Sequence, residues 1–285
     1  MLWEIDMKFT KMQGIGNDYV YINCFDEAID MDEIAALTVR LSDRHFGVGS
    51  DGVILICPSD KADFRMRMFN GCDGSEAEMC GNGIRCVGKY VHDKHLTDKT
   101  TVTVETLAGI KTLGLNLVDG QVDTVRVDMG EPVFACGKIP VATDGPEFVD
   151  QPVQTPLGTY RMTAVSMGNP HAVTFVEDVE GLEIEKIGPL LENHPLFPKR
   201  ANIEFIQVVS DGILRMRVWE RGSGETLACG TGACASIAAA VVNGRSRRQV
   251  KMRLLGGELE LDWNETNNHV YMTGPARFVF DGELL

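Results

Sequence analysis

One motif occurs twice in this chain, and this repeat limits the possible folds more than any other feature. The first copy spans residues 64–86 and reads FRMRMFNGCDGSEAEMCGNGIRC. The second copy spans residues 214–234 and reads LRMRVWERGSGETLACGTGAC. Both begin with alternating apolar residues and arginines, and both continue to a glutamate, three further residues, and a cysteine that precedes a Gly-x-Gly turn. Repetition of such a long motif predicts two domains with the same fold.

The repeat extends beyond this motif at a nearly constant spacing. Asn17 corresponds to Asn169 at an offset of 152 residues, and Cys80 corresponds to Cys229 at an offset of 149 residues. Residues 130–150, which lie between the two copies, are rich in proline, glycine and aspartate. Such a segment favours a boundary between domains.

The end of the chain predicts how the first domain is completed. Residues 274–278 resemble residues 130–134, so we expect the last strand to return to the first domain. We therefore predict a first domain of residues 1–131 with 272–285, and a second domain of residues 132–271.

Composition restricts the classes of function. The net charge of −14 argues against a nucleic-acid partner, which requires a basic surface to neutralise phosphates. The N-terminus lacks the basic and apolar regions of a signal peptide. The longest apolar run, residues 235–242, is far shorter than the roughly 20 residues of a membrane span. These features predict a cytoplasmic protein without a membrane segment, whose eight cysteines are mostly reduced.

The two repeated cysteines are the candidate catalytic residues. Cys80 and Cys229 each precede a helical pattern, and the N-terminus of a helix stabilises an anion through its unpaired amides. This position is expected to lower the pKa of each thiol and to make it a general base. The adjacent glycines allow backbone N–H groups to bind a carboxylate. Two thiols on opposite sides of one tetrahedral carbon would remove one proton and supply another, which inverts the configuration.

The repeated glutamates and arginines around the cysteines allow two interpretations. Packing alone does not require the glutamate and glycines to repeat, so their repetition favours a functional role. The arginines at positions 65, 67, 215 and 217 alternate along strands, and we interpret them as solvated strand faces rather than ligand clamps.

Other site types fit these residues less well. Gly47–Gly52 matches G-x-G-x-x-G, but a helix precedes it and a strand follows it, the reverse of a dinucleotide site. The cysteines at C-x5-C and C-x4-C spacing lack the C-x2-C spacing of most structural zinc sites. A hydrolase-type nucleophile made of Cys229 and His171 leaves Cys80 unexplained. The sequence therefore predicts neither a cofactor nor a metal ion.

Three motifs resemble those of diaminopimelate epimerases: GNGIRC after Met79-Cys80, SMGNPH at residues 166–171, and ERGSGETLACGTGAC at residues 220–234. The resemblance runs from Met7 to near the C-terminus. It implies an α/β (α+β) fold of two pseudo-symmetric domains, each a curved, mostly antiparallel sheet or open barrel around a central helix, with the active site in the interdomain cleft. It also implies a cytoplasmic homodimer that interconverts L,L-2,6-diaminopimelate and meso-diaminopimelate. Such an isomerase uses no pyridoxal phosphate or metal, and serves lysine and peptidoglycan precursor biosynthesis.

The resemblance also implies roles for individual residues. Cys80 and Cys229 would be the acid and the base, and His171 and Glu220 would assist the cysteines or pair with the substrate ammonium. The planar fork of Arg221 suits the distal carboxylate of the substrate. The residues expected to bind the substrate are Asn17, Asn70, Gly81, Asn82, Asn169, Asn202, Glu220, Arg221, Gly230 and Thr231.

The sequence departs from the family pattern in two places. Gly52 stands where some members carry a glutamine that contacts the substrate. The segment between Asn70 and Cys80 has one residue more than the usual spacing, at Gly71-Cys72. The role of Asn70 therefore depends on how this turn accommodates the extra residue.

Two alternative functions use the same scaffold. A proline or hydroxyproline racemase uses the same two-thiol chemistry, but it usually has Cys-Gly-His-Gly where this chain has Cys-Gly-Asn-Gly at Cys80. Proline also lacks a distal charge for Arg221 to bind. A non-catalytic amino-acid-binding protein would be expected to lack one of the cysteines, and this chain has both.

Overall fold

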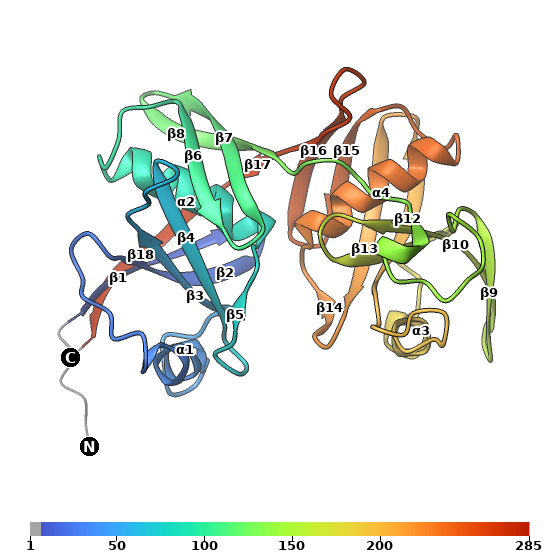
Figure 1. The fold of residues 1–285 in the computed structure, drawn as a ribbon, viewed down its shortest axis with the longest axis horizontal. Helices are drawn as coiled ribbons and strands as arrows, with labels where there is room; N and C mark the ends of the chain where they lie inside the picture. Colours follow the sequence, from blue (N-terminus) through green and yellow to red (C-terminus); the bar gives the residue numbers. More distant parts are fainter. Residues whose placement is uncertain (1–6, 285) are drawn as a thin grey trace. The chain divides into compact units, whose positions relative to one another are not determined.

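The computed structural model describes residues 7–284 and divides into two compact units (Figure 1). Unit 1 comprises Met1–Val127 with Gly274–Leu285, and unit 2 comprises Asp128–Thr273. The sequence placed residues 128–131 and 272–273 in the first domain, whereas their contacts place them in unit 2. Within residues 7–284, no helix is long and apolar enough to span a membrane.

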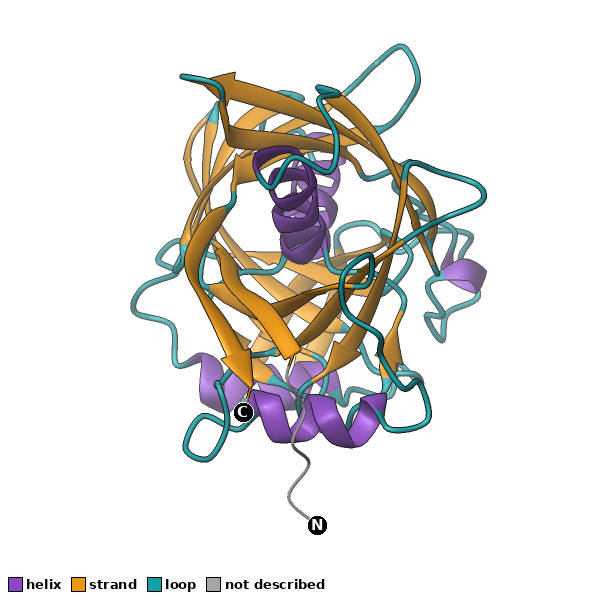
Figure 2. Cartoon of the chain, turned by 90° about the vertical axis from the view of Figure 1, so that its left-hand side faces the viewer, coloured by secondary structure: helices purple, strands orange, loops and turns teal. Residues whose placement is uncertain are grey.

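Unit 1 is a curved sheet around one helix, α2 (Gly81–Asp93), which Figure 2 shows at its centre. Neighbouring strands are antiparallel except in the pairs β2–β3 and β4–β6. Helix α1 (Ile34–Ser42) packs on the outside of the sheet, against β3 and β4. The strand order is β18 (Arg277–Leu284), β1 (Met7–Gly14), β2 (Asn17–Asn23), β3 (Gly52–Cys57), β4 (Phe64–Asn70), β6 (Thr101–Thr106), β7 (Gly109–Val118) and β8 (Gln121–Asp128), with β5 (Glu76–Ala77) beside β4.

Unit 2 repeats this topology around α4 (Gly230–Val242). Its parallel pairs, β11–β12 and β13–β15, occupy the same places in the order, and α3 (Ile184–Glu192) corresponds to α1. A short 3-10 helix, Cys136–Lys138, precedes the first strand. The strand order is β9 (Gln151–Thr155), β10 (Gly158–Ser166), β11 (Pro170–Phe175), β12 (Asn202–Ser210), β13 (Ile213–Glu220), β15 (Gln249–Leu254), β16 (Gly257–Trp263) and β17 (Val270–Pro275), with β14 (Gly224–Thr226) beside β13.

The central helices are buried for different reasons. Helix α4 is apolar on all sides and rich in alanine, a pattern typical of a helix enclosed by other elements. Helix α2 instead contains two buried cations, Arg85 and Lys89. Arg85 donates to the carbonyl oxygen of Pro275 at 3.2 Å, and Lys89 donates to that of Val122 at 2.6 Å. These bonds offset the cost of burying the charges and fasten the helix to the surrounding chain.

The repeated glutamate of each motif forms an ion pair with a repeated arginine. Arg67 binds both carboxylate oxygens of Glu76 at 2.8 Å, and Arg217 binds those of Glu225 at 2.6 and 3.0 Å. Each pair joins a long strand to the short strand that precedes the cysteine. The interpretation of Arg67 and Arg217 as solvated faces is therefore wrong, and the repetition of the glutamate has a structural reason.

Candidate active site

Cys80 lies at the N-terminus of α2 and caps it with its side chain. Its backbone is extended (φ −119°, ψ 119°), and its Sγ accepts a hydrogen bond from the Gly83 amide at 3.3 Å. The thiol in turn donates to Oδ1 of Asn17 at 3.1 Å. Gly81 and Asn82 form the first turn of the helix. We call Cys80, Asn17, Gly81 and Asn82 the Cys80 half-site.

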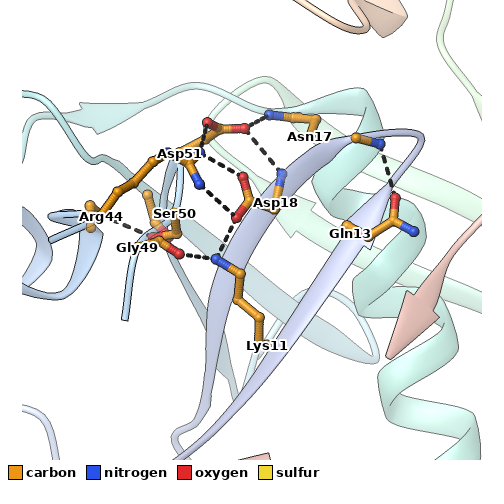
Figure 3. Close-up of polar contacts among 11 residues, drawn as sticks. Lys11, Gln13, Asn17, Asp18, Arg44, Gly49, Ser50 and Asp51 are labelled. Atoms are coloured by element: carbon orange, nitrogen blue, oxygen red, sulfur yellow. Dashed lines mark hydrogen bonds and ion pairs between the residues drawn. The ribbon is translucent and has the colours of Figure 1, made fainter. Parts of the chain in front are cut away.

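The amide of Asn17 is oriented by a carboxylate that the sequence did not indicate. Asp51 accepts a hydrogen bond from Nδ2 of Asn17 at 2.6 Å and from the backbone N–H of Asp18 at 3.0 Å (Figure 3). Arg44 binds the other oxygen of Asp51 at 2.9 Å. Because the NH2 group of Asn17 is held by Asp51, its carbonyl oxygen is presented to the thiol of Cys80.

Asp18 anchors the same cluster through two cations. Arg44 binds it at 2.9 Å, and the buried Lys11 also forms an ion pair with it (Figure 3). Burial acts to raise the pKa of Asp18, but the hydrogen bonds from Arg44 and Lys11 outweigh it and hold the pKa below its usual value. The ion pairs therefore stabilise the folded state more when Asp18 is ionised.

This coupling predicts how stability depends on pH. A lowered folded pKa gives a contribution that is fully present above the unfolded pKa of about 4 and is lost as pH falls through the folded pKa. We expect Asp18→Asn to lower the thermal midpoint at pH 7, and the difference from wild type to shrink below about pH 4. Circular dichroism measures this difference in thermal midpoint at pH 7 and at lower pH values. Asp60→Asn, at an exposed position, is the control. A difference that does not change with pH would contradict the assignment.

Asn70 is hydrogen-bonded to the turn that follows it. Its Nδ2 donates to Oγ of Ser75 at 3.0 Å, across the turn that contains the extra residue. Gly52 pairs with Asn70 in the β3–β4 register, and a Cβ atom on Gly52 would overlap the carbonyl oxygen of Phe69. The backbone of β4 thus fills the space that a side chain at position 52 would need.

Cys229 occupies the equivalent position in unit 2, at the N-terminus of α4. Its backbone angles are φ −124° and ψ 110°, and its Sγ accepts from the Gly232 amide at 3.3 Å. The sulfur also lies 3.6 Å from Oγ1 of Thr231 in the first helical turn. Cys229 is buried, with 6% of its surface exposed, whereas Cys80 is partly exposed.

A chain of polar contacts leads away from Thr231. Nδ2 of Asn169 donates to Oγ1 of Thr231 at 3.3 Å, and Oδ1 of Asn169 lies 2.9 Å from Nε2 of His171. Nδ1 of His171 lies 2.6 Å from a carboxylate oxygen of Glu204. Both members of this histidine–glutamate pair are fully buried. Together with Cys229 and Gly230, these residues form the Cys229 half-site.

The electrostatic environment of Cys229 differs from the one expected at a helix N-terminus. Burial, followed by the negative charges of Glu220 and Glu204, raises the pKa of the Cys229 thiol well above its usual value. The hydrogen bonds from Thr231 and the Gly232 amide act in the opposite direction and do not outweigh these effects. The expectation of a lowered pKa is therefore wrong for Cys229, because desolvation and two carboxylates exceed the effect of the helix.

The remaining predicted residues lie at the end of β13 and beside it. Glu220 accepts a hydrogen bond from Oγ1 of Thr226 at 2.5 Å. Oδ1 of Asn202 accepts from the backbone N–H of Arg221 at 2.9 Å, which joins two of the predicted residues. The guanidinium of Arg221 donates to the carbonyl oxygen of Lys199 at 3.2 Å, and its side chain is exposed.

Strand register defines which residues of the two half-sites are equivalent. Tyr19 pairs with Gly52 in unit 1, and His171 pairs with Asn202 in unit 2. Asn17 and Asn169, which precede these residues by two positions, are therefore equivalent, and each contacts the first turn of the central helix or its cap. The prediction from sequence omitted Asp51 and Glu204. Glu204 could have been noticed in the sequence, because it is a charged residue at a position where the first repeat has an apolar one.

Comparison with known proteins identifies the family. The family model described as diaminopimelate epimerase matches residues 9–135 and 163–279. The chain belongs to the diaminopimelate epimerase family. A diaminopimelate epimerase of Acetivibrio thermocellus is 59% identical over 278 residues, which cover 98% of each chain. One of Methanococcus maripaludis (strain C5) is 55% identical over 279 residues, 98% of this chain and 99% of that protein. The family and the isomerase class predicted from the three motifs are confirmed.

Solved structures with little sequence identity share the fold of this family member. A hydroxyproline epimerase from Agrobacterium vitis matches with a TM-score of 0.69 at 19% identity, over 100% of this chain and 94% of that chain. A Bacillus anthracis phenazine biosynthesis protein of the PhzF family matches with a TM-score of 0.71 at 16% identity, over 99% of both chains. At this identity the likeness shows the fold alone. It confirms the predicted two-domain α+β architecture.

Proposed function

We propose that this chain is a cofactor-independent epimerase that interconverts L,L-2,6-diaminopimelate and meso-diaminopimelate, in the biosynthesis of lysine and peptidoglycan precursors. The diaminopimelate epimerases with more than half of their residues identical support the substrate. The geometry that carries the mechanism is the matched pair of cysteine caps. Each sulfur accepts a backbone N–H at 3.3 Å from the third residue of a helix, on the same local backbone conformation.

The reaction is a proton transfer with inversion at the α-carbon. The thiolate of Cys80 removes the α-proton from one face, and the thiol of Cys229 donates a proton to the opposite face. In the reverse direction the two residues exchange roles. The raised pKa of Cys229 suits it to the role of proton donor. This mechanism requires both sulfurs to reach one carbon of a single substrate molecule in the working enzyme.

The carbanion formed between these steps needs stabilisation that the chain itself supplies. Without an electron sink, negative charge develops on the α-carboxylate, and hydrogen-bond donors aimed at that group lower the barrier. The first turns of α2 and α4 provide such donors at Gly81, Asn82, Gly230 and Thr231. Helix N-termini also carry partial positive charge, which favours an anionic ligand.

The remaining residues are proposed to recognise the ends of the substrate. The exposed guanidinium of Arg221 binds the distal carboxylate in a two-point contact. Four asparagines hold the amino acid groups of the substrate. His171 and Glu220 assist the cysteines or pair with the ammonium, and His171 contacts Asn169 directly. The asparagines are Asn17, Asn70, Asn169 and Asn202.

We further propose a cytoplasmic homodimer that has a small-molecule substrate, without a nucleic-acid partner, cofactor or metal ion. The net charge of −14 supports the absence of a nucleic-acid partner, because phosphates would be repelled. Size-exclusion chromatography with light scattering measures the oligomeric state directly.

The proposed function predicts substrate-specific isotope exchange. In reduced buffer made with D2O and no added cofactor, we expect deuterium to enter the α-position of L,L-diaminopimelate and the meso isomer to form. L-proline, incubated in parallel, is expected to remain unlabelled because it has no distal carboxylate for Arg221. Proton NMR measures both reactions. Exchange in proline alone would assign the chain to the racemase chemistry of the alternative, and exchange in neither would leave a binding protein.

A further inference from the structure

The two half-sites share a backbone but differ at one buried position. Glu204 pairs with Val173 in the β11–β12 register, and Ile54 pairs with Tyr21 in the equivalent β2–β3 register, so Glu204 and Ile54 are equivalent. Each faces the third residue of the central helix of its unit. A Cβ atom on Gly232 would lie 2.6 Å from Oε1 of Glu204, and one on Gly83 would lie 2.6 Å from Cδ1 of Ile54. A carboxylate therefore replaces a methyl group at the same place.

Glu204 is an expensive residue to bury. It has no exposed surface, one oxygen contacts His171, and within residues 7–284 the other oxygen has no hydrogen-bond partner. A buried carboxylate with incomplete hydrogen bonding destabilises a fold relative to an apolar side chain of similar size. Unit 1 shows that the topology accepts isoleucine at this position. The carboxylate is therefore not required by packing.

We propose that Glu204 is a positioning residue of the Cys229 half-site, which keeps Cys229 in the thiol form and, through His171, fixes the amide of Asn169. This inference rests on the proposed epimerase function, since only a two-thiol mechanism gives the protonation of Cys229 a role. It adds to that function a residue that sets which of the two thiols starts as the acid.

The carboxylate of Glu204 and the sulfur of Cys229 both lie next to Gly232, which has no side chain. The position of a Cβ atom on Gly232 is 2.6 Å from Oε1 of Glu204 and 3.2 Å from Sγ of Cys229. A negative charge on Glu204, close to the buried sulfur, disfavours the thiolate form of Cys229. The direction of the Cys229 pKa agrees with this argument.

The other polar groups near Cys229 act in both directions: the hydrogen bonds from Thr231 and the Gly232 amide lower the pKa of its thiol, but they do not outweigh burial and the two carboxylates. Glu220, at the end of β13, also carries a negative charge that raises the pKa of Cys229. From β11, His171 contacts Glu204 and Asn169, and from α4 itself Thr231 offers a hydroxyl at 3.6 Å. The Cys80 half-site has Ile54 in place of the carboxylate, so the two thiols differ in their environment.

The second role of Glu204 acts through the histidine ring. Its oxygen holds Nδ1 of His171 at 2.6 Å, which directs Nε2 toward Oδ1 of Asn169 at 2.9 Å. The NH2 group of Asn169 is then directed to Oγ1 of Thr231 at 3.3 Å. Asn169 is thereby held in one orientation next to Cys229, much as Asp51 holds Asn17 next to Cys80.

A protonation measurement that needs no turnover tests the proposal. The protein is labelled with 13Cβ-cysteine, and the signals of Cys229 and Cys80 are assigned from the spectra of Cys229→Ser and Cys80→Ser variants. The 13Cβ shift then follows thiol and thiolate through a pH titration. In Glu204→Gln we expect the Cys229 midpoint to move to lower pH while the Cys80 midpoint stays unchanged. Glu192→Gln is the matched control, since Glu192 is buried in the same unit but contacts Trp219 and Gly222.

The outcomes separate this proposal from the proposed function. An unchanged Cys229 midpoint in a folded Glu204→Gln protein, or an equal shift at Cys80, would overturn the role of Glu204 and leave the epimerase intact. If the Cys229 midpoint shifts in Glu204→Gln but the wild-type protein has no epimerase activity, the electrostatic role stands and the proposed function is overturned. If Glu204→Gln does not fold, Glu204→Ile carries the test, because Ile54 fills the equivalent position in unit 1.

Discussion

Replacing Cys229 with alanine is expected to abolish epimerisation while proton exchange continues in one stereoisomer. A single remaining thiol can remove the α-proton and return one from solvent, but only to the same face of the carbon. Configuration is then retained. Loss of a general acid or base typically costs about 10²–10⁴ in rate, so epimerisation by either single variant should fall at least this far.

The test compares Cys80→Ala and Cys229→Ala in D2O with each diaminopimelate stereoisomer. Each variant should label one isomer only, and the two variants should label different isomers. Proton NMR reports deuterium content, and chiral chromatography reports configuration. Cys86→Ala and Cys234→Ala are the controls, because these buried cysteines lie within the same helices and should leave epimerisation in place. Continued epimerisation by either active-site variant, or labelling of the same isomer by both, would contradict the two-thiol mechanism.

The internal repeat made the fold predictable from sequence alone. Strands were evident from alternating residues, and each cysteine with its Gly-x-Gly turn predicted a helix after the turn. The helices begin earlier than expected, at Gly81 and Gly230, so the glycines belong to their first turns. The resemblance of residues 274–278 to 130–134 predicted a returning strand, and β18 pairs with β1. These features depend on local pattern and on repetition, both of which a single sequence contains.

The electrostatics of the site were not predictable in the same way. The pKa of Cys229 is raised by burial and by the charges of Glu220 and Glu204, and Glu204 lies on a different strand and approaches Cys229 across Gly232. The orientation of Asn17 depends in the same way on Asp51. Such effects require the distances between elements. A comparison of the two repeats residue by residue would nevertheless have marked Glu204, since Ile54 stands at the equivalent position.

At position 52 the strand pairing leaves no space for a side chain. Gly52 pairs with Asn70 across β3 and β4, and a Cβ atom at this position would overlap the carbonyl oxygen of Phe69 and lie 3.2 Å from the amide nitrogen of Gly71. Gly71 belongs to the turn that contains the extra residue. The backbone of β4 thus occupies the space that a side chain at position 52 would need, and such a side chain cannot be accommodated without moving β4.

We therefore expect Gly52→Ala to destabilise unit 1 strongly. Overpacking against a backbone atom cannot be relieved by a rotamer change, so the cost should reach the upper part of the usual range, about 3 kcal/mol, and should lower the thermal midpoint by about 5–10 °C. Differential scanning calorimetry measures this change. Gly114→Ala is the matched control in the same unit, since a Cβ atom there makes only ordinary contacts with Arg126. A Gly52→Ala protein as stable as Gly114→Ala would mean that β4 shifts freely and that position 52 can accept a side chain.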